Sequence, residues 1–351
     1  MTPIDAVQRA WQAERIALLP TPWQTRVRRA HDERMTAAAA RYYADHGQTL
    51  RDANMWLLQA TERIRKIRVP ISLTDEQLRD MASDRAMRCS KLAEIVPGVY
   101  YTDTRALRQR MAAYVVRYGI KPPGDKIADA PAIARMTCEQ WWRRQLRKTQ
   151  GRDLEREAIN LGYVHKAQEI YASSITVERR SQQRKRNASL LAEAAAVNLD
   201  TGELYTLAEL AAKSVSNPGV RRGELMTRIK GFEGMAKVLE HSAEFITLTA
   251  PSKYHAKTTV DGRIVDNPKF QGYTPRDTHR YLNALWCRIR AKLHRMGVRA
   301  YGFRITEAHH DGTPHWHLLL FVPGNQVQTL REVVTEHAMR DEANEPGAKA
   351  N

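Results

Sequence analysis

Residues 301–323, YGFRITEAHHDGTPHWHLLLFVP, constrain the fold of this chain more than any other stretch. Two apolar runs, Tyr301–Thr306 and His315–Val322, stand on either side of the turn signal Asp311-Gly312. Alternating apolar runs joined by an Asp-Gly turn are typical of a β-hairpin. The sequence therefore predicts an antiparallel sheet near the end of the chain.

The same hairpin brings two imidazoles and a carboxylate together. His315 and His317 project from one face of the second strand, and Glu307 stands at the end of the first. A His-x-His pair is usually surface decoration, but this pair opens a strongly apolar strand, where exposed imidazoles would be wasteful. Because two imidazoles and a carboxylate suit a divalent metal, we predict a metal site there. His309 and His310 are expected to be solvated or to face a substrate.

The charge of the chain points to a polyanionic partner. Lys and Arg number 56 against 39 Asp and Glu, which gives a net charge of +17. Nucleic acid is the leading candidate for such a partner. The sequence contains no apolar run of about 18 residues and no signal peptide, so no membrane association is predicted. The three cysteines are isolated, which fits a reducing cytoplasm rather than a disulfide framework.

Candidate DNA contacts lie in two places. Lys253 and His255 follow the strand FITLT as possible phosphate contacts, and the segment ERRSQQRKRN (178–187) holds five basic residues: Arg179, Arg180, Arg184, Lys185 and Arg186. Such a run either binds phosphates or forms a solvated helix face, and the sequence leaves both readings open. For Trp141 and Trp142 we predict a place in the core.

The chain changes character along its length. Residues 1–240 read as a basic, mostly helical region, with helices expected at 35–46, 74–96 and within 132–197. Thr74 and Gln77 form a possible capping box, and Pro97-Gly98 should end the second helix.

Residues 241–351 read as strand, helix and hairpin. FITLT (245–249) is the strand, with Ile246 and Leu248 toward the core and its threonines explained by strand propensity. A loop of roughly 25 residues containing Asp261-Gly262 follows. The helix covers 279–296, has one apolar face, and is closed by Gly297.

Four segments in order carry a family resemblance. PHWHLLLF (314–321) resembles the HUH motif of the HUH endonucleases, and FITLTAPSKYH (245–255) resembles the first rolling-circle replication motif. NPGVRRGELMTRIKGFE (217–233) and WWRRQLRK (141–148) are similar to segments of the replication gene A proteins of temperate tailed phages and prophages. The resemblance covers most of residues 90–323.

This resemblance implies an α+β fold, in which a mostly helical amino-terminal region (1–240) precedes a partial HUH domain (241–351) with an antiparallel sheet flanked by helices. It implies an initiator of rolling-circle replication that nicks origin DNA through a 5′-phosphotyrosyl intermediate. The cofactor would be Mg²⁺ or Mn²⁺, held by His315, His317 and Glu307. The partners would be origin DNA and the helicase and replication machinery of a bacterial host, in its cytoplasm.

The nucleophile is the point where the sequence departs from this pattern. In replication-type members a tyrosine pair follows the His-x-His motif, but residues 323–351 contain no tyrosine. We therefore expect no catalytic residue within the chain, a pair beyond Asn351, and a truncated protein. The relaxase-type order would instead nominate Tyr254, Tyr273 or Tyr281.

Two other functions stay open. A nuclease without its nucleophile would be a non-catalytic module that binds an origin or single-stranded DNA. Iron oxygenases also use two histidines and a carboxylate. The high net charge and the position of Glu307 before the His-x-His pair argue against an oxygenase.

Overall fold

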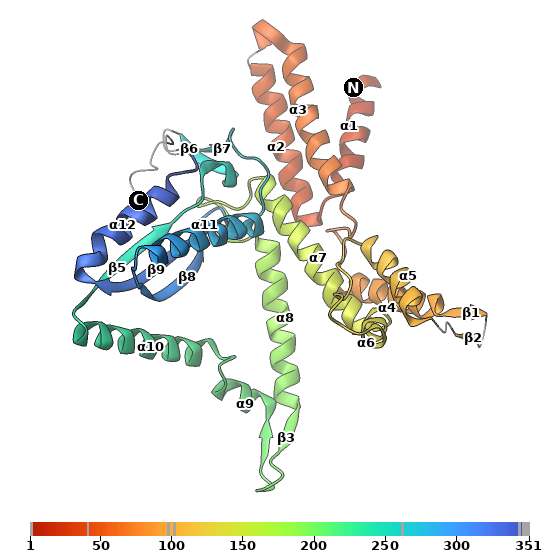
Figure 1. Cartoon of the computed structure of the whole chain (residues 1–351). Coiled ribbons are helices and arrows are strands. Elements are labelled where there is room, and N and C mark those ends of the chain that lie inside the picture. Colours follow the sequence, from red (N-terminus) through yellow and green to blue (C-terminus); the bar gives the residue numbers. More distant parts are fainter. Residues whose placement is uncertain are drawn as a thin grey trace. The chain divides into compact units, whose positions relative to one another are not determined.

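The computed structural model describes residues 3–40, 42–96, 99–100, 103–260, 263–342 and 345. It divides into two compact units, Met1–Glu157 and Ala158–Asn351 (Figure 1). The sequence character changes near residue 241, whereas the units part between Glu157 and Ala158. Helix α10 (Pro218–Val238) belongs to the second unit and packs against the sheet that follows it. No helix among the described residues is long and apolar enough to cross a membrane.

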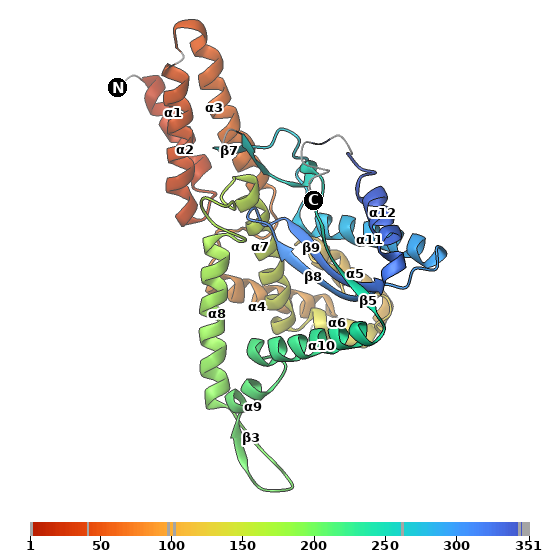
Figure 2. The same ribbon diagram turned by 90° about the vertical axis from the view of Figure 1, so that its left-hand side faces the viewer.

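The first unit is almost entirely helical. Its helices are α1 (Pro3–Ile16), α2 (Thr21–Ala40), α3 (Tyr42–Arg65), α4 (Asp75–Leu92), α5 (Thr104–Val116), α6 (Asp129–Met136) and α7 (Glu139–Asn160), the last of which runs into the second unit. Helices α2 and α3 lie side by side (Figure 2). The capping box of Thr74 and Gln77 is present at the start of α4, as the sequence predicts.

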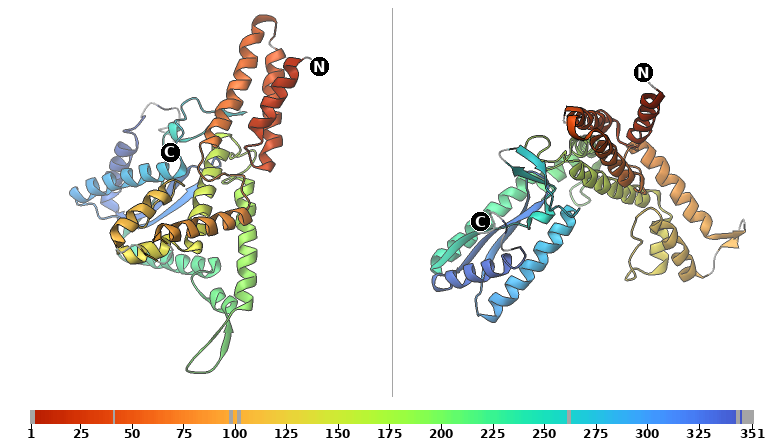
Figure 3. Two further views of the ribbon diagram at one scale, coloured as in Figure 1. Left: turned by 90° about the vertical axis from the view of Figure 1, so that its right-hand side faces the viewer. Right: turned by 90° about the horizontal axis from the view of Figure 1, so that it is seen from above.

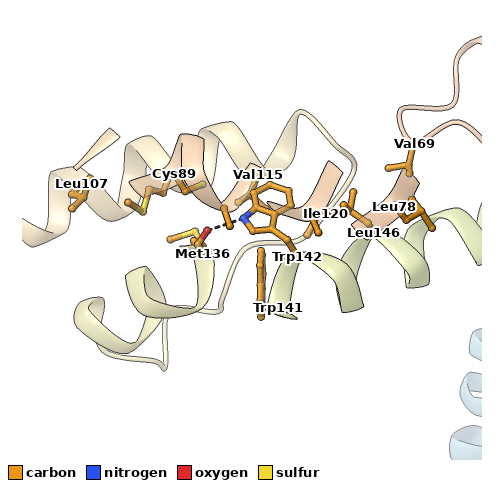
Figure 4. Packing of buried hydrophobic residues seen from close by; sticks show 13 residues of the cluster. Val69, Leu78, Cys89, Leu107, Val115, Ile120, Met136, Trp141, Trp142 and Leu146 are labelled. Atoms are coloured by element: carbon orange, nitrogen blue, oxygen red, sulfur yellow. Dashed lines mark hydrogen bonds between the residues drawn. The ribbon is translucent and has the colours of Figure 1, made fainter. Parts of the chain in front are cut away.

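One apolar core of this unit lies between α4, α5, α6 and α7 (Figure 4). Trp142 is fully buried and its Nε1–H donates to the carbonyl oxygen of Met136 at 2.7 Å. Trp141 is 8% exposed and packs edge-on against Trp142. The predicted core positions of both tryptophans are confirmed, and their neighbour Arg147 pairs with Asp75 at the start of α4.

Two predicted helices end earlier than expected. Helix α4 stops at Leu92, and Glu94–Val96 forms strand β1, which pairs with β2 (Val99–Tyr100). The predicted stop at Pro97-Gly98 lies outside the described residues. Helix α8 (Ser174–Glu193) likewise gives way to β3 (Ala195–Val197), which pairs with β4 (Leu204–Thr206). The short strand that follows each of these helices ends in a valine, whose branched side chain favours a strand.

The second unit contains the predicted sheet and its covering helices. Besides α8 and α10, its elements are α9 (Leu207–Lys213), β5 (His241–Leu248), β6 (Lys257–Val260), β7 (Arg263–Asp266), α11 (Pro275–Arg295), β8 (Tyr301–Ala308), β9 (Pro314–Pro323) and α12 (Val327–Ala338). The loop expected after FITLT holds the β6–β7 hairpin, whose turn at Asp261-Gly262 lies outside the described residues. The predicted α+β class is confirmed.

Strand β9 is the centre of an antiparallel sheet with the order β5-β9-β8. Its even-numbered residues face α11 and α12. They form the core of the unit with the apolar face of α11 and the last residue of β5: Leu248, Leu282, Leu285, Ile289, Leu293, Trp316, Leu318, Leu320 and Val322. Helix α10 lies on the other side of the sheet, as the view from above shows (Figure 3). There Phe232 packs edge-on against Phe303. The odd-numbered side of β9, with both histidines, is therefore free of α11 and α12.

Candidate metal centre

Strand register places the three predicted ligands together. Glu307 of β8 pairs directly with His315 of β9, and Ile305 pairs with His317. The ligand atoms of Glu307, His315 and His317 all lie within 4.8 Å of one another. Strand β8 runs two residues beyond the predicted end, so that Glu307 is held by the sheet rather than by the turn.

The geometry fits a single ion. Nε2 of His315 lies 2.9 Å from Nε2 of His317, and Nε2 of His317 lies 3.3 Å from a carboxylate oxygen of Glu307. Two ligand atoms at right angles on bonds of about 2.1 Å are separated by about 3.0 Å. Two imidazoles and one carboxylate suit Mn²⁺ better than Mg²⁺, which prefers oxygen ligands alone.

Strand β5 orients one of these ligands. Thr247 pairs with His317 across the strands, and its hydroxyl lies 3.0 Å from Nδ1 of that ring. An Nδ1–H that donates to this oxygen leaves Nε2 free to bind metal. Phe245 stacks on the same ring at 5.4 Å. Strand propensity is the only role that the sequence indicates for Thr247, because its partner His317 lies 70 residues further along the chain.

Burial favours the neutral form of His315. His315 is 9% exposed, and burial lowers its pKa, with a further lowering from the neighbouring imidazole of His317. A metal binds only the neutral imidazole. The pKa shift therefore favours metal binding near neutral pH.

His309 is expected from the sequence to be solvated or to face a substrate, and its surroundings rule out the first of these. It is half-buried, and its ring centroid lies 4.0 Å from that of His315 and 5.3 Å from that of His255. Its Nε2 is buried with no hydrogen-bond partner. His309 is thus not solvated, whereas His310 is exposed, with its ring 5.6 Å from Tyr171.

A hollow of about 220 Å³ opens beside this turn, lined by His255, His309, Asp311 and Lys166 among others. Nδ1 of His255 lies 2.7 Å from a carboxylate oxygen of Asp311, so the ring N–H donates to the carboxylate. Although burial acts to raise the pKa of Asp311, the hydrogen bond and charge of His255 bring it below its usual value. His255 is therefore oriented at the edge of the hollow, and its phosphate contact stays a prediction.

The stability of the metal-free chain should depend on pH through His309. Burial lowers the pKa of folded His309 to about 4, against about 6.5 for an exposed histidine. Because the unfolded chain takes up the proton first, stability should fall as the pH drops from about 6.5 toward 4. Thermal unfolding across this range should show a shallower loss for His309→Gln than for wild type. The exposed His294→Gln is the matched control, and identical slopes for His309→Gln and wild type would contradict this account.

The other predicted DNA contacts differ in their surroundings. The ammonium of Lys253 lies 3.0 Å from Asp341 and 3.5 Å from Glu342, so two carboxylates compete with any phosphate. The five basic residues of 178–187 all lie on α8, where Arg180, Arg184, Lys185 and Arg186 are exposed and Arg179 is half-buried. Their contact with DNA stays a prediction.

The upstream tyrosines form a cluster of their own. The ring of Tyr254 stacks on Tyr273 at 4.4 Å and lies 5.1 Å from Tyr281. Burial raises the pKa of Tyr281 to about 12 and also raises that of Tyr254. A nucleophilic phenol is activated by a neighbouring base, by a lowered pKa or by metal coordination, and a raised pKa acts against the second of these. These surroundings disfavour the relaxase-type order.

The family of the chain follows from its similarity to known proteins. The family model of the bacteriophage replication gene A protein (GPA) matches residues 76–351. The chain belongs to this family. The match includes all three residues of the candidate metal centre and confirms the resemblance to the replication gene A proteins.

Curated proteins similar to this chain carry names that agree with this family. The chain is 43% identical over 213 residues to the replication gene A protein of Escherichia phage 186, a match that covers 61% of this chain and 30% of that protein. It is 32% identical over 328 residues to the probable replication protein P12 of Pseudoalteromonas phage PM2, covering 85% of this chain and 50% of that protein. The chain is also 32% identical over 255 residues to a probable replication endonuclease from a prophage-like region of Salmonella paratyphi A, a match that covers 73% of this chain and 30% of that protein. The chain thus spans half or less of these relatives' length, and no solved structure gives a significant match.

Proposed function

We propose that this chain carries the metal centre of a phage or prophage replication initiator, a nickase that cuts one strand of origin DNA to start rolling-circle replication. The observation that carries the proposal is the convergence of Glu307, His315 and His317 on one face of the sheet. A net charge of +17 supports a polyanionic substrate, and relatives named replication endonuclease support a nuclease. The host helicase and replication machinery remain expected partners.

The side chains have distinct tasks in this proposal. His315, His317 and Glu307 would hold Mn²⁺ or Mg²⁺, and the bound ion would supply Lewis-acid polarisation of the scissile phosphate. Thr247 fixes the orientation of the His317 ring. The carboxylate of Glu307 is 56% exposed, which leaves the centre open on the side where DNA would approach.

The covalent step would follow the pattern that the resemblance implies. The phenolic oxygen of a tyrosine forms a bond to phosphorus as the bond to the 3′ oxygen breaks, and the phenolic proton ends on the free 3′-hydroxyl. The phosphotyrosyl bond keeps the energy of the broken phosphodiester, so rejoining needs no ATP. The tyrosine is expected after the His-x-His pair, outside residues 323–351.

A nicking assay tests the proposal. Supercoiled plasmid carrying the candidate origin is incubated with Mn²⁺ and either this chain or a version extended through the next downstream reading frame. We expect only the extended version to nick the plasmid and to become covalently attached to DNA, because only it would supply the tyrosine. A version with His315→Ala should do neither.

Two outcomes would overturn parts of the proposal. Nicking by the short chain that is lost in His315→Ala would place the nucleophile upstream. Binding of the origin by both versions without cleavage would favour the non-catalytic binding module.

A further inference from the structure

We propose that the first unit carries a binding site for nucleotide phosphate groups, formed by a basic hollow at the end of α3, the loop after α5 and one face of α7. The hollow has a volume of about 320 Å³. Its charged lining consists of five basic side chains and one carboxylate: Arg63, Lys66, Arg68, Arg152, Arg156 and Asp153. These residues are far from the His-x-His hairpin in sequence, and nothing in the metal centre uses them.

The walls of the hollow are fixed by the core behind them. Arg68 is followed by Val69, and Gly119 by Ile120, and both of these apolar residues are almost fully buried. The side chain of Gln150 on α7 donates to the carbonyl oxygen of Pro70 at 2.9 Å. The loop after α3, the loop after α5 and helix α7 are thereby held together before any ligand binds.

Three of the five cations are held in place by groups of the protein. Arg63 pairs with the buried carboxylate of Glu157 at 3.1 Å, and Arg156 pairs with Asp153 at 2.8 Å. A guanidinium nitrogen of Arg68 donates to the carbonyl oxygen of Val116 at 2.5 Å. Guanidinium groups that are already oriented lose less entropy when they bind an anion.

The other two cations have no such partner. Lys66 and Arg152 are exposed, and neither side chain makes a hydrogen bond or ion pair with a described residue. The hollow therefore holds more positive than negative charge, and an anion is the ligand that would balance it.

Phosphate is the anion that this arrangement fits. Several guanidinium forks around one hollow suit phosphate oxygens. The volume is at the lower end of small-ligand pockets, roughly 300–1,000 Å³, and admits one nucleotide rather than a protein segment. The phosphate would come either from the DNA backbone, a source that rests on the proposed function, or from a free nucleoside triphosphate.

The test compares two double variants of the full chain that remove the same charge. Lys66→Gln with Arg152→Gln changes the hollow, and Arg79→Gln with Arg105→Gln changes two exposed arginines outside it. Binding to a labelled single-stranded oligonucleotide is measured by fluorescence anisotropy in EDTA over a range of salt. Loss of two phosphate contacts should reduce the slope of log affinity against log salt by about 1.4, and the control should leave it at the wild-type value. Labelled ATP is the second probe.

Each outcome has one meaning. A smaller salt slope for the hollow variant alone supports the site with DNA as its source, and loss of ATP binding alone supports the site with a free nucleotide. Equal behaviour of both double variants with both probes would overturn the inference. Mn²⁺ titration of the wild-type chain separates the two proposals. If the wild-type chain binds no Mn²⁺ while the two double variants still differ in oligonucleotide or ATP binding, only the metal centre is contradicted.

Discussion

Replacing His317 with alanine is expected to lower the affinity for Mn²⁺ by on the order of 100-fold or more and to abolish metal-dependent nicking by the extended protein. His317 is the ligand that touches both others, 2.9 Å from His315 and 3.3 Å from Glu307. Its removal leaves one imidazole and one exposed carboxylate, which hold a divalent ion weakly. Isothermal titration with Mn²⁺ measures the change in affinity.

A graded series makes this result specific. Thr247→Val keeps the shape of the side chain but removes the hydroxyl that lies 3.0 Å from Nδ1 of His317. We expect a loss of about 10-fold in Mn²⁺ affinity, the lower end of the effect of second-layer partners of metal ligands. His294→Ala, an exposed imidazole on α11, is the control and should bind Mn²⁺ as wild type does. Unchanged Mn²⁺ affinity in His317→Ala would contradict the assignment of the centre.

Replacing Gly302 with alanine is expected to destabilise the second unit by on the order of 3 kcal/mol or more. Gly302 has a φ of +148°, and a Cβ there would lie 1.9 Å from the carbonyl oxygen of Leu319. Because that atom belongs to the backbone of the central strand, the overlap is relieved only by moving β8 away from β9. Urea unfolding followed by circular dichroism measures the change in stability.

The same substitution should weaken metal binding. Gly302 pairs with Leu320 in the register that also sets Glu307 opposite His315. Gly231→Ala on α10 is the matched control, since a Cβ there meets nothing within 4 Å. It should leave Mn²⁺ binding unchanged and stabilise the helix by about 0.5–1 kcal/mol. A Gly302→Ala protein within 1 kcal/mol of wild type would be evidence against the strand geometry described above.

The sequence by itself determined the local elements. An Asp-Gly turn between alternating runs predicted the β8–β9 hairpin, and apolar spacing predicted the buried face of α11, because both signals are repeats within one segment. The same alternation placed His315 and His317 on one side of a strand with Glu307 opposite. The candidate metal centre could be predicted because all three ligands belong to one hairpin.

Only the tertiary structure decided what surrounds these elements. The contact of Thr247 with His317 depends on pairing between residues 70 positions apart, and the surroundings of His309 include His255, which comes from a distant loop. The basic hollow gathers Arg63, Arg68 and Arg152 from separate helices and loops, so no single segment signals it. Side-chain periodicity fixes the face of one strand or helix, whereas register between distant segments and the depth of burial are set by packing of the whole unit.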